Sequence, residues 1–135
     1  MLKVTFDPSV PIYTQIVDRF RREICSGARQ PGERIEPVRE LAGTLGVNPN
    51  TLQRALGELE REGLVYAERT AGRFVTQDTE RIFAVQKELS RTMVRDFVMK
   101  MRALGCTLEQ ILELVGQEMA SMEGEQQDAD GTQDR

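Results

Sequence analysis

Residues 39–54 combine side chains that can bind phosphate groups and the edges of nucleic-acid bases. Arg39 and Arg54 carry guanidinium groups, which donate paired hydrogen bonds to a phosphate or to guanine. Asn50 and Gln53 carry amides, and a glutamine amide can pair with the edge of adenine. Such contacts are specific only when a rigid element presents the side chains together. The elements around this segment therefore decide what its chemistry can do.

The chain contains no histidine, which removes a residue on which many active sites depend. It therefore has no Ser/His/Asp or Cys/His pair, no imidazole base and no histidine-ligated metal. Cys25 and Cys106 are 81 positions apart and form no CxxC motif, so we expect two reduced thiols. The carboxylates of Asp96, Glu109 and Glu113 are too scattered to predict a metal site. We expect no catalytic residue, no cofactor and no metal.

Length and composition fit one small domain with an accessory element, because 135 residues with 39% apolar side chains are too few for two full-sized cores. No apolar run reaches the roughly eighteen residues of a spanning helix, and the N-terminus lacks a signal-peptide core. We expect a soluble, cytoplasmic protein with no membrane contact. The net charge of −4 resides in residues 123–135, which hold one basic and five acidic side chains. This tail has a single apolar residue and is predicted to be disordered.

Apolar periodicity predicts a first helix that begins after Pro11 and ends at Gly27, with isoleucine or phenylalanine at every fourth position. Residues 29–34 contain a Pro-Gly pair, which is typical of a turn, and a short extended piece is expected at Ile35. The first helix has one apolar face, so it needs other elements to cover it.

Two short helices are predicted on either side of a tight turn at Gly46. The first begins near Pro37, and the second begins after Asn48, which is a good N-cap. Ala42, Gly46 and Leu52 have the spacing of a helix-turn-helix: a small residue where the helices meet, a glycine for the turn and an aliphatic anchor. The segment that carries the amides and guanidinium groups is therefore predicted to be a helix-turn-helix.

After Gly63, residues 64–68 and 73–76 have the pattern of two strands joined by a turn at residues 69–72. A β-hairpin directly after a helix-turn-helix forms a wing. Residues 1–76 are therefore predicted to be a winged helix-turn-helix domain, within a chain that is mostly α with a small β-wing.

Residues 77–122 are predicted to form a two-helix dimerisation hairpin. Asp78 or Thr79 caps a long first helix, and Thr107 begins the second, with Gln110 completing a capping box. The apolar stripe of these helices exceeds what the small domain can cover. Its predicted interface residues are Ile82, Val85, Leu89, Met93, Phe97, Met101, Leu108, Ile111, Leu112, Val115 and Met119. The methionines also fit a ligand pocket, but two helices cannot enclose a drug-sized cavity within one subunit, so a small-molecule effector is expected only at the dimer interface.

A set of short motifs follows this order of elements. They are Pro11-Ile-Tyr-Thr-Gln-Ile16, Gly27, Pro31-Gly-Glu33, Val38-Arg-Glu-Leu-Ala42, Leu45-Gly-Val47, Thr51-Leu52, Arg54-Ala-Leu56, Glu60, Glu62-Gly-Leu-Val65 and Gly72-x-Phe-Val75. In this order they resemble the GntR family of bacterial winged-helix transcription regulators over residues 11–75. Asn48-Pro-Asn-Thr51, Glu58-Leu-Glu-Arg-Glu-Gly63 and a C-terminal part of only two helices are similar to the YtrA-type branch. Members of that branch are dimeric and often repress operons for ABC transporters.

The resemblance implies DNA contacts from the second helix, the third helix and the wing. Arg39 matches the family arginine at the start of the second helix and can bind a phosphate or guanine. An ion pair with Glu36 or Glu40 is the alternative. Glu36 is a departure from the Leu-Pro-Ser that is frequent in the family at this segment. As a consequence, a carboxylate lies close to the expected DNA backbone.

On the third helix, the resemblance implies contacts from five residues. Asn48, Asn50 and Thr51 lie where free backbone N–H groups favour a phosphate, and Asn48 is expected to be the N-cap as well. Gln53 is expected to pair with an adenine edge, and Arg54 with a guanine or a phosphate.

On the wing, Arg69, Gly72 and Arg73 are expected to reach phosphates or the minor groove. Many family members have arginine where Pro49 and Gln53 stand here, so the base preferences of those relatives do not carry over. The usual Gly-x-Gly of the wing is reduced to its second glycine, which predicts a stiffer wing tip.

These features predict a homodimeric, sequence-specific regulator that binds double-stranded DNA at a near-palindromic operator and associates with the nucleoid there. It is expected to repress a nearby operon, with transporter genes among the candidates. The alternative is a winged-helix adaptor that binds proteins and not DNA, but an adaptor would expose apolar residues on the third helix, where this chain has polar ones. An enzyme is more distant, because Glu58, Glu60 and Glu62 are typical of a solvated helix surface.

Overall fold

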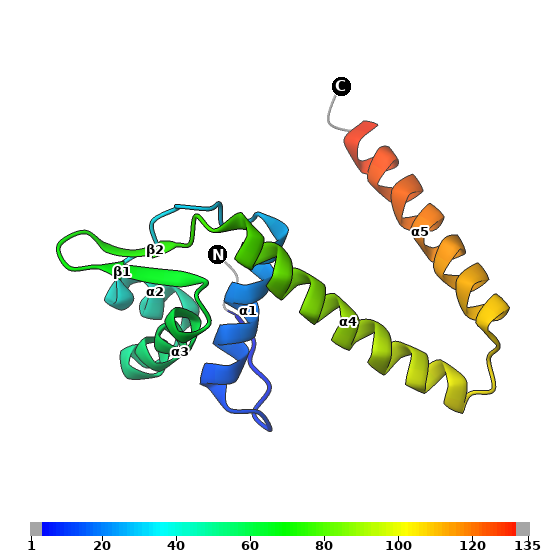
Figure 1. The fold of residues 1–135 in the computed structure, drawn as a ribbon, viewed down its shortest axis with the longest axis horizontal. Coiled ribbons are helices and arrows are strands. Elements are labelled where there is room, and N and C mark those ends of the chain that lie inside the picture. The colour runs from blue at the N-terminus through cyan, green and yellow to red at the C-terminus, as the bar shows by residue number, and fades with distance from the viewer. Residues whose placement is uncertain (1–3, 132–135) are drawn as a thin grey trace. The chain divides into compact units, whose positions relative to one another are not determined.

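A computed structural model describes residues 4–131, and Figure 1 shows the helices and strands that they form. These elements are α1 (Ile12–Ser26), α2 (Val38–Leu45), α3 (Pro49–Arg61), β1 (Val65–Glu68), β2 (Gly72–Val75), α4 (Thr79–Ala103) and α5 (Leu108–Gly131). The predicted fold class, mostly helical with a small wing, is confirmed. Across residues 4–131, every helix is too short or too polar to span a bilayer.

The chain divides into two compact units, one up to Leu89 and one from Ser90 onward. The boundary therefore falls inside α4, later than the predicted boundary after residue 76. The physical reason is that the first turns of α4 contribute to the core of the first unit. Val85 is buried in that core, and Ile82 and Leu89 pack against it.

The helix ends follow the local signals in the sequence. α1 begins after Pro11 and ends at Gly27, where a φ of 83° gives the left-handed backbone that favours glycine. Gly46 has a φ of 71° and separates α2 from α3, and the Val47 N–H donates to the Ala42 carbonyl at 3.0 Å. The predicted helix-turn-helix is therefore confirmed.

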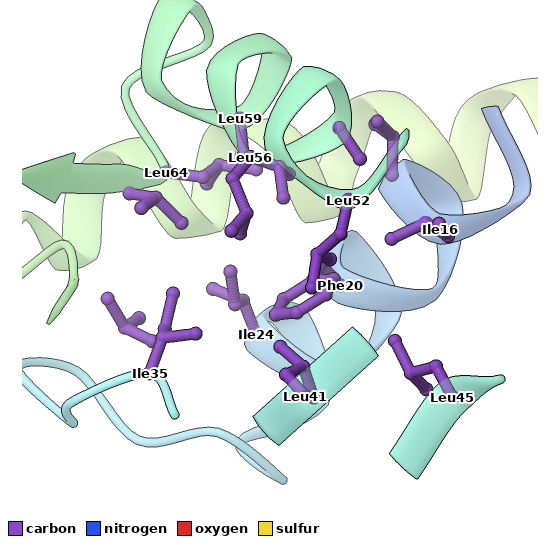
Figure 2. Close-up of a cluster of buried hydrophobic side chains, with 14 of the residues drawn as sticks. Ile16, Phe20, Ile24, Ile35, Leu41, Leu45, Leu52, Leu56, Leu59 and Leu64 are labelled. Carbon is purple, nitrogen blue, oxygen red and sulfur yellow. The ribbon is translucent and has the colours of Figure 1, made fainter. Parts of the chain in front are cut away.

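The core of the first unit lies between α1, α2 and α3, and Figure 2 shows its side chains meeting in one cluster. Phe20 of α1 and Leu52 of α3 are almost completely buried, at 1% and 0% exposure. Ile35, from the extended piece before α2, closes the cluster. Burial of these apolar faces fixes α3 in the domain and leaves its opposite face to the solvent.

The wing is an antiparallel pair of strands in which Val65 lies opposite Val75 and Tyr66 opposite Phe74. The rings of Tyr66 and Phe74 stack with their centroids 5.5 Å apart. The extended piece before α2 joins this sheet, because the Ile35 N–H donates to the Arg73 carbonyl at 2.8 Å. The wing is thus attached to the same core as the helices.

The last helix differs from the prediction at its C-terminal end. It begins as expected, since Thr107 Oγ1 accepts from the Gln110 N–H at 3.2 Å and the Gln110 side chain accepts from the Thr107 N–H at 2.8 Å. α5 then continues to Gly131, so the prediction of disorder from residue 123 is wrong for residues 123–131. Glutamate, glutamine and alanine are good helix formers, and they propagate a helix that has already begun. Residues 132–135 lie outside the described part of the chain.

Candidate nucleic-acid interface

The N-terminal turn of α3 is capped by Asn48, as predicted. The Asn48 side-chain oxygen accepts a hydrogen bond from the Asn50 N–H at 2.8 Å, and Pro49 occupies the first helical position. Asn50 is exposed, and Thr51 is half-buried. The positive end of the helix dipole therefore opens beside two polar side chains, an arrangement that favours an anion.

The next turn of α3 presents Gln53 and Arg54, and both side chains are exposed. Consecutive residues of a helix point about 100° apart, so the two side chains leave α3 on different sides. The Arg54 guanidinium lies over the ring of Tyr13 on α1, with Cζ 3.7 Å from the ring centroid. An open hollow beside this contact is lined by Ile12, Tyr13, Asn50, Thr51 and Arg54.

Arg39 on α2 is exposed and has no carboxylate within ion-pairing distance among the described residues. The alternative of an ion pair with Glu36 is excluded, because Glu36 binds Arg29, with Arg29 Nη1 and Glu36 Oε2 3.0 Å apart. Glu40, the other candidate partner, makes no ion pair with Arg39. The guanidinium of Arg39 is thus available to an external ligand.

The pair between Arg29 and Glu36 also neutralises the carboxylate that departs from the family pattern. Partial burial acts to raise the pKa of Glu36, but hydrogen bonds from its own backbone N–H and from Arg29 outweigh it, and the pKa lies below the ordinary value. Arg29 is held by a second carboxylate, that of Glu23, and its guanidinium lies 4.6 Å from the ring centroid of Phe20. Glu36 is therefore ionised and paired at neutral pH, which reduces its repulsion of a phosphate.

The two predicted arginines of the wing differ in whether a carboxylate pairs with them. Arg69, in the turn between the strands, is exposed and has no carboxylate partner within residues 4–131. Arg73 instead bonds to α3, with its Nε 2.7 Å from Glu60 Oε1 and a quarter of its side chain exposed. The prediction that Arg73 reaches DNA is not supported by this geometry, because its charge already has a partner. Gly72 has a φ of 104°, which favours glycine at the start of β2.

Arg34 is a candidate that sequence reasoning missed. It precedes the buried Ile35 in the extended piece, and its side chain is exposed beside the wing. A Cβ built on Gly72 would lie 3.5 Å from Arg34 Nε, so this guanidinium lies beside the first residue of β2, near the turn of the hairpin. No ion pair of Arg34 occurs in the described part of the chain. The alternation of an extended segment, with Ile35 inward and Arg34 outward, is the signal that points to it.

The second predicted site is the apolar surface of α4 and α5. Among the predicted residues in the unit that begins at Ser90, only Ile111 is buried and Met101 is half-buried. The exposed ones are Met93, Phe97, Leu108, Leu112, Val115 and Met119, with exposed fractions from 39% to 71%. Ile82, Val85 and Leu89 were assigned to the same interface, but Val85 lies in the core of the first unit, and Ile82 and Leu89 pack against that core. The apolar stripe along α4 is thus buried or half-buried in the first unit at Ile82, Val85 and Leu89 and exposed in the second unit at Met93 and Phe97.

Comparison with known proteins agrees with this architecture. The model of the bacterial regulatory proteins of the gntR family matches residues 12–75. The HTH-type transcriptional regulator YhcF of Bacillus subtilis (strain 168) is 38% identical over 108 residues, which cover 80% of this chain and 89% of that protein. The HTH-type transcriptional repressor YtrA of the same organism is 28% identical over 125 residues, covering 92% of this chain and 96% of the relative.

A solved structure extends the likeness to three dimensions. A GntR family transcriptional regulator from Listeria monocytogenes superposes with a TM-score of 0.79 at 38% identity, over 83% of this chain and 98% of that one. These relatives are named as transcriptional regulators, in agreement with the prediction that the chain is not an enzyme. On this sequence and structural likeness, the chain is a winged helix-turn-helix transcriptional regulator of the GntR family, and its similarity to YtrA over nearly its whole length supports the YtrA-like branch.

Proposed function

We propose that this regulator is a homodimeric, sequence-specific DNA-binding repressor of a nearby operon. The observation that carries the proposal is the solvent-facing side of the helix-turn-helix and wing. Arg34, Arg39, Arg54 and Arg69 stand there without carboxylate partners among the described residues. Guanidinium groups at these positions fit phosphates and base edges.

The division of charges in the first unit supports this proposal. Glu36, Glu58 and Glu60 each bond to an arginine that is not among the four named above. With these three carboxylates neutralised and four arginines unpaired, the surface favours a polyanion, even though residues 1–76 carry a net charge of only +1.

The dimer is supported by the exposed apolar side chains of the second unit. Met93 is 68% exposed, Leu108 71% and Leu112 62%. Soluble monomers rarely leave so many large apolar residues in water, and a second copy of the same surface would cover them. Two copies of the first unit would then bind two half-sites of a near-palindromic operator.

The name of one relative bears on the direction of regulation. The Bacillus subtilis relative YtrA is a transcriptional repressor and matches this chain along nearly its whole length. We infer repression for this chain as well, with transporter genes as candidate targets and a cytoplasmic location at the nucleoid. A small-molecule effector would act at the dimer interface by changing the separation of the two DNA-binding units.

The test is fluorescence-anisotropy binding of the purified chain to the DNA upstream of its own gene, over a salt series and against random-sequence competitor. We expect binding that resists the competitor and saturates at two subunits per site. Simultaneous replacement Arg39→Ala and Arg54→Ala should abolish this binding and leave the dimer intact, as measured by sedimentation. If the wild type bound the upstream DNA no more tightly than random duplex, this DNA would not contain the operator. Selection from a random DNA pool would then decide: enrichment of no sequence would reject specific DNA recognition and favour the adaptor.

A further inference from the structure

The contact between Tyr13 and Arg54 joins a fixed ring to an exposed cation. Tyr13 lies in the first turn of α1 and packs, partly buried, against the core. Arg54 is exposed, and its Cζ lies 3.7 Å from the centre of the Tyr13 ring, well inside the range of a cation–π interaction. The ring therefore holds a long side chain that would otherwise sample many rotamers in water.

This contact determines on which side of α3 the guanidinium lies. Glu60 stands two turns after Gln53, on the same side of the helix, and it bonds to Arg73 of the wing at 2.7 Å. The Gln53 side of α3 therefore faces the wing. Arg54 leaves α3 about 100° away from Gln53 and contacts Tyr13, so its side of α3 faces α1.

The surroundings of the guanidinium are suited to a phosphate. Arg54 has no carboxylate partner in the described part of the chain, and it lines an open hollow with two polar residues from the first turn of α3, Asn50 and Thr51. The backbone N–H groups of that turn and the helix dipole favour an anion at the same place. A cation held beside such a turn adds charge to the site without a further loss of side-chain freedom on binding.

We infer that Tyr13 is a positioning residue that holds Arg54 on the α1 side of α3 for contact with a DNA phosphate, which leaves Gln53 to read a base. The inference rests on the proposed DNA binding and goes beyond it. It resolves the alternatives for Arg54, guanine or phosphate, in favour of the phosphate. It also assigns a role in DNA binding to α1, a helix that carries none of the predicted contacts.

Four variants test the inference in the full-length chain: Tyr13→Phe, Tyr13→Leu, Arg54→Ala and Gln53→Ala. Phenylalanine keeps the aromatic face, whereas leucine keeps only the apolar packing against the core. Without DNA, the proton NMR signals of the Arg54 side chain should be shifted upfield by the ring in the wild type and in Tyr13→Phe. In Tyr13→Leu they should move to their ordinary positions, and urea denaturation should show that all four variants are folded.

Binding to a random-sequence duplex over a salt series then measures the phosphate contact, because this contact does not depend on the base sequence. Arg54→Ala should reduce the slope of log K against log salt by about 0.9, the value for one phosphate. Tyr13→Leu should weaken binding roughly two- to thirtyfold, the range of one cation–π contact. Tyr13→Phe should bind like the wild type. Selection from a random DNA pool should show an altered base preference for Gln53→Ala and an unchanged one for Arg54→Ala.

The outcomes separate this inference from the proposed function. A wild-type chain that binds no duplex at all would reject DNA binding itself. If the wild type, Tyr13→Leu and Tyr13→Phe all bound duplex equally well, only the role of Tyr13 would be overturned. An altered base preference in Arg54→Ala with an unchanged salt slope would show that Arg54 reads a base, and the phosphate assignment would be wrong.

Discussion

The two arginines of the wing differ in whether they have a carboxylate partner. Arg73 and Arg69 both belong to the wing, but Arg73 is bound to Glu60 whereas Arg69 has no carboxylate partner in the described residues. A paired guanidinium contributes to the stability of the fold, and an unpaired one is available to a ligand. The sequence distance between the two residues gives no indication of this difference.

Replacing these two arginines should therefore have opposite effects. Arg73→Ala should lower the free energy of unfolding by about 0.5 kcal/mol, because it removes a partly exposed ion pair, and should leave affinity for random duplex nearly unchanged. Arg69→Ala should leave stability unchanged and weaken duplex binding, with a salt slope reduced by about 0.9. Urea denaturation and anisotropy on the same samples provide both measurements. Equal losses of DNA affinity in the two variants would mean that Arg73 leaves Glu60 when DNA binds.

The pair between Glu36 and Arg29 predicts a dependence of stability on pH. The folded state lowers the pKa of Glu36 below its ordinary value near 4.5, so the folded protein holds the ionised form more strongly than the unfolded chain does. This contribution is complete above the pKa of the unfolded state and is lost as the pH falls through the lowered pKa of the folded state. Glu36→Gln should therefore remove part of the loss of stability that occurs as the pH falls below the ordinary pKa of Glu36, measured by the urea midpoint at each pH. A variant with the same pH profile as the wild type would contradict this role.

At the scale of elements, the helix-turn-helix depends on the backbone of Gly46. Its φ of 71° lies in the left-handed region, where a side chain adds strain even though nothing lies within 4 Å of the position that a Cβ would take. Gly43, three residues earlier within α2, has the same open space and no such constraint. The two glycines thus form a matched pair that separates backbone strain from packing.

We expect Gly46→Ala to lower the free energy of unfolding by roughly 1 to 2 kcal/mol and Gly43→Ala to raise it by about 0.5 to 1 kcal/mol, because alanine favours the helix interior. Thermal or urea denaturation measures both changes. Gly46→Ala should also weaken binding to DNA if the turn sets the angle of α3. If the two substitutions changed stability in the same direction, the backbone of the turn would not be the cause.

At the scale of the whole molecule, the second unit provides the apolar surface proposed for dimerisation. Leu112 and Leu114 are both exposed on α5, at 62% and 45%, but two residues along a helix correspond to about 200° of rotation. Leu112 lies on the predicted interface stripe, and Leu114 lies on the opposite side of the helix. The same substitution at the two positions therefore tests the stripe and not merely the hydrophobicity of the helix.

Leu112→Asp should weaken the dimer by roughly 3 kcal/mol or more, about two orders of magnitude in the dissociation constant, because it places an unpaired charge in the interface. Leu114→Asp should leave the dimer unchanged. Analytical ultracentrifugation over a concentration series gives both constants, and circular dichroism verifies the helix content. Dissociation by Leu114→Asp alone would place the interface on the other side of α5.

The amino-acid sequence by itself determined the order of the elements and most of their ends. Gly27 and Gly46 end their helices, Asn48 caps α3, and Thr107 with Gln110 begins α5, because these signals act within a few residues of the chain. The family followed from the same local motifs in their order. The end of α5 was the local prediction that failed, because helix propagation through residues 123–131 outweighed the polar composition of that segment.

Only the tertiary structure decided which surface each side chain meets. Periodicity shows that Val85 and Phe97 share a stripe on α4, but it cannot show that Val85 is buried in the first unit while Phe97 remains exposed. The partner of Arg73 and the ring beneath Arg54 were equally hidden, since Glu60 and Tyr13 lie 13 and 41 residues away in the chain. Such contacts arise when packing brings distant segments together, and local signals carry no information about them.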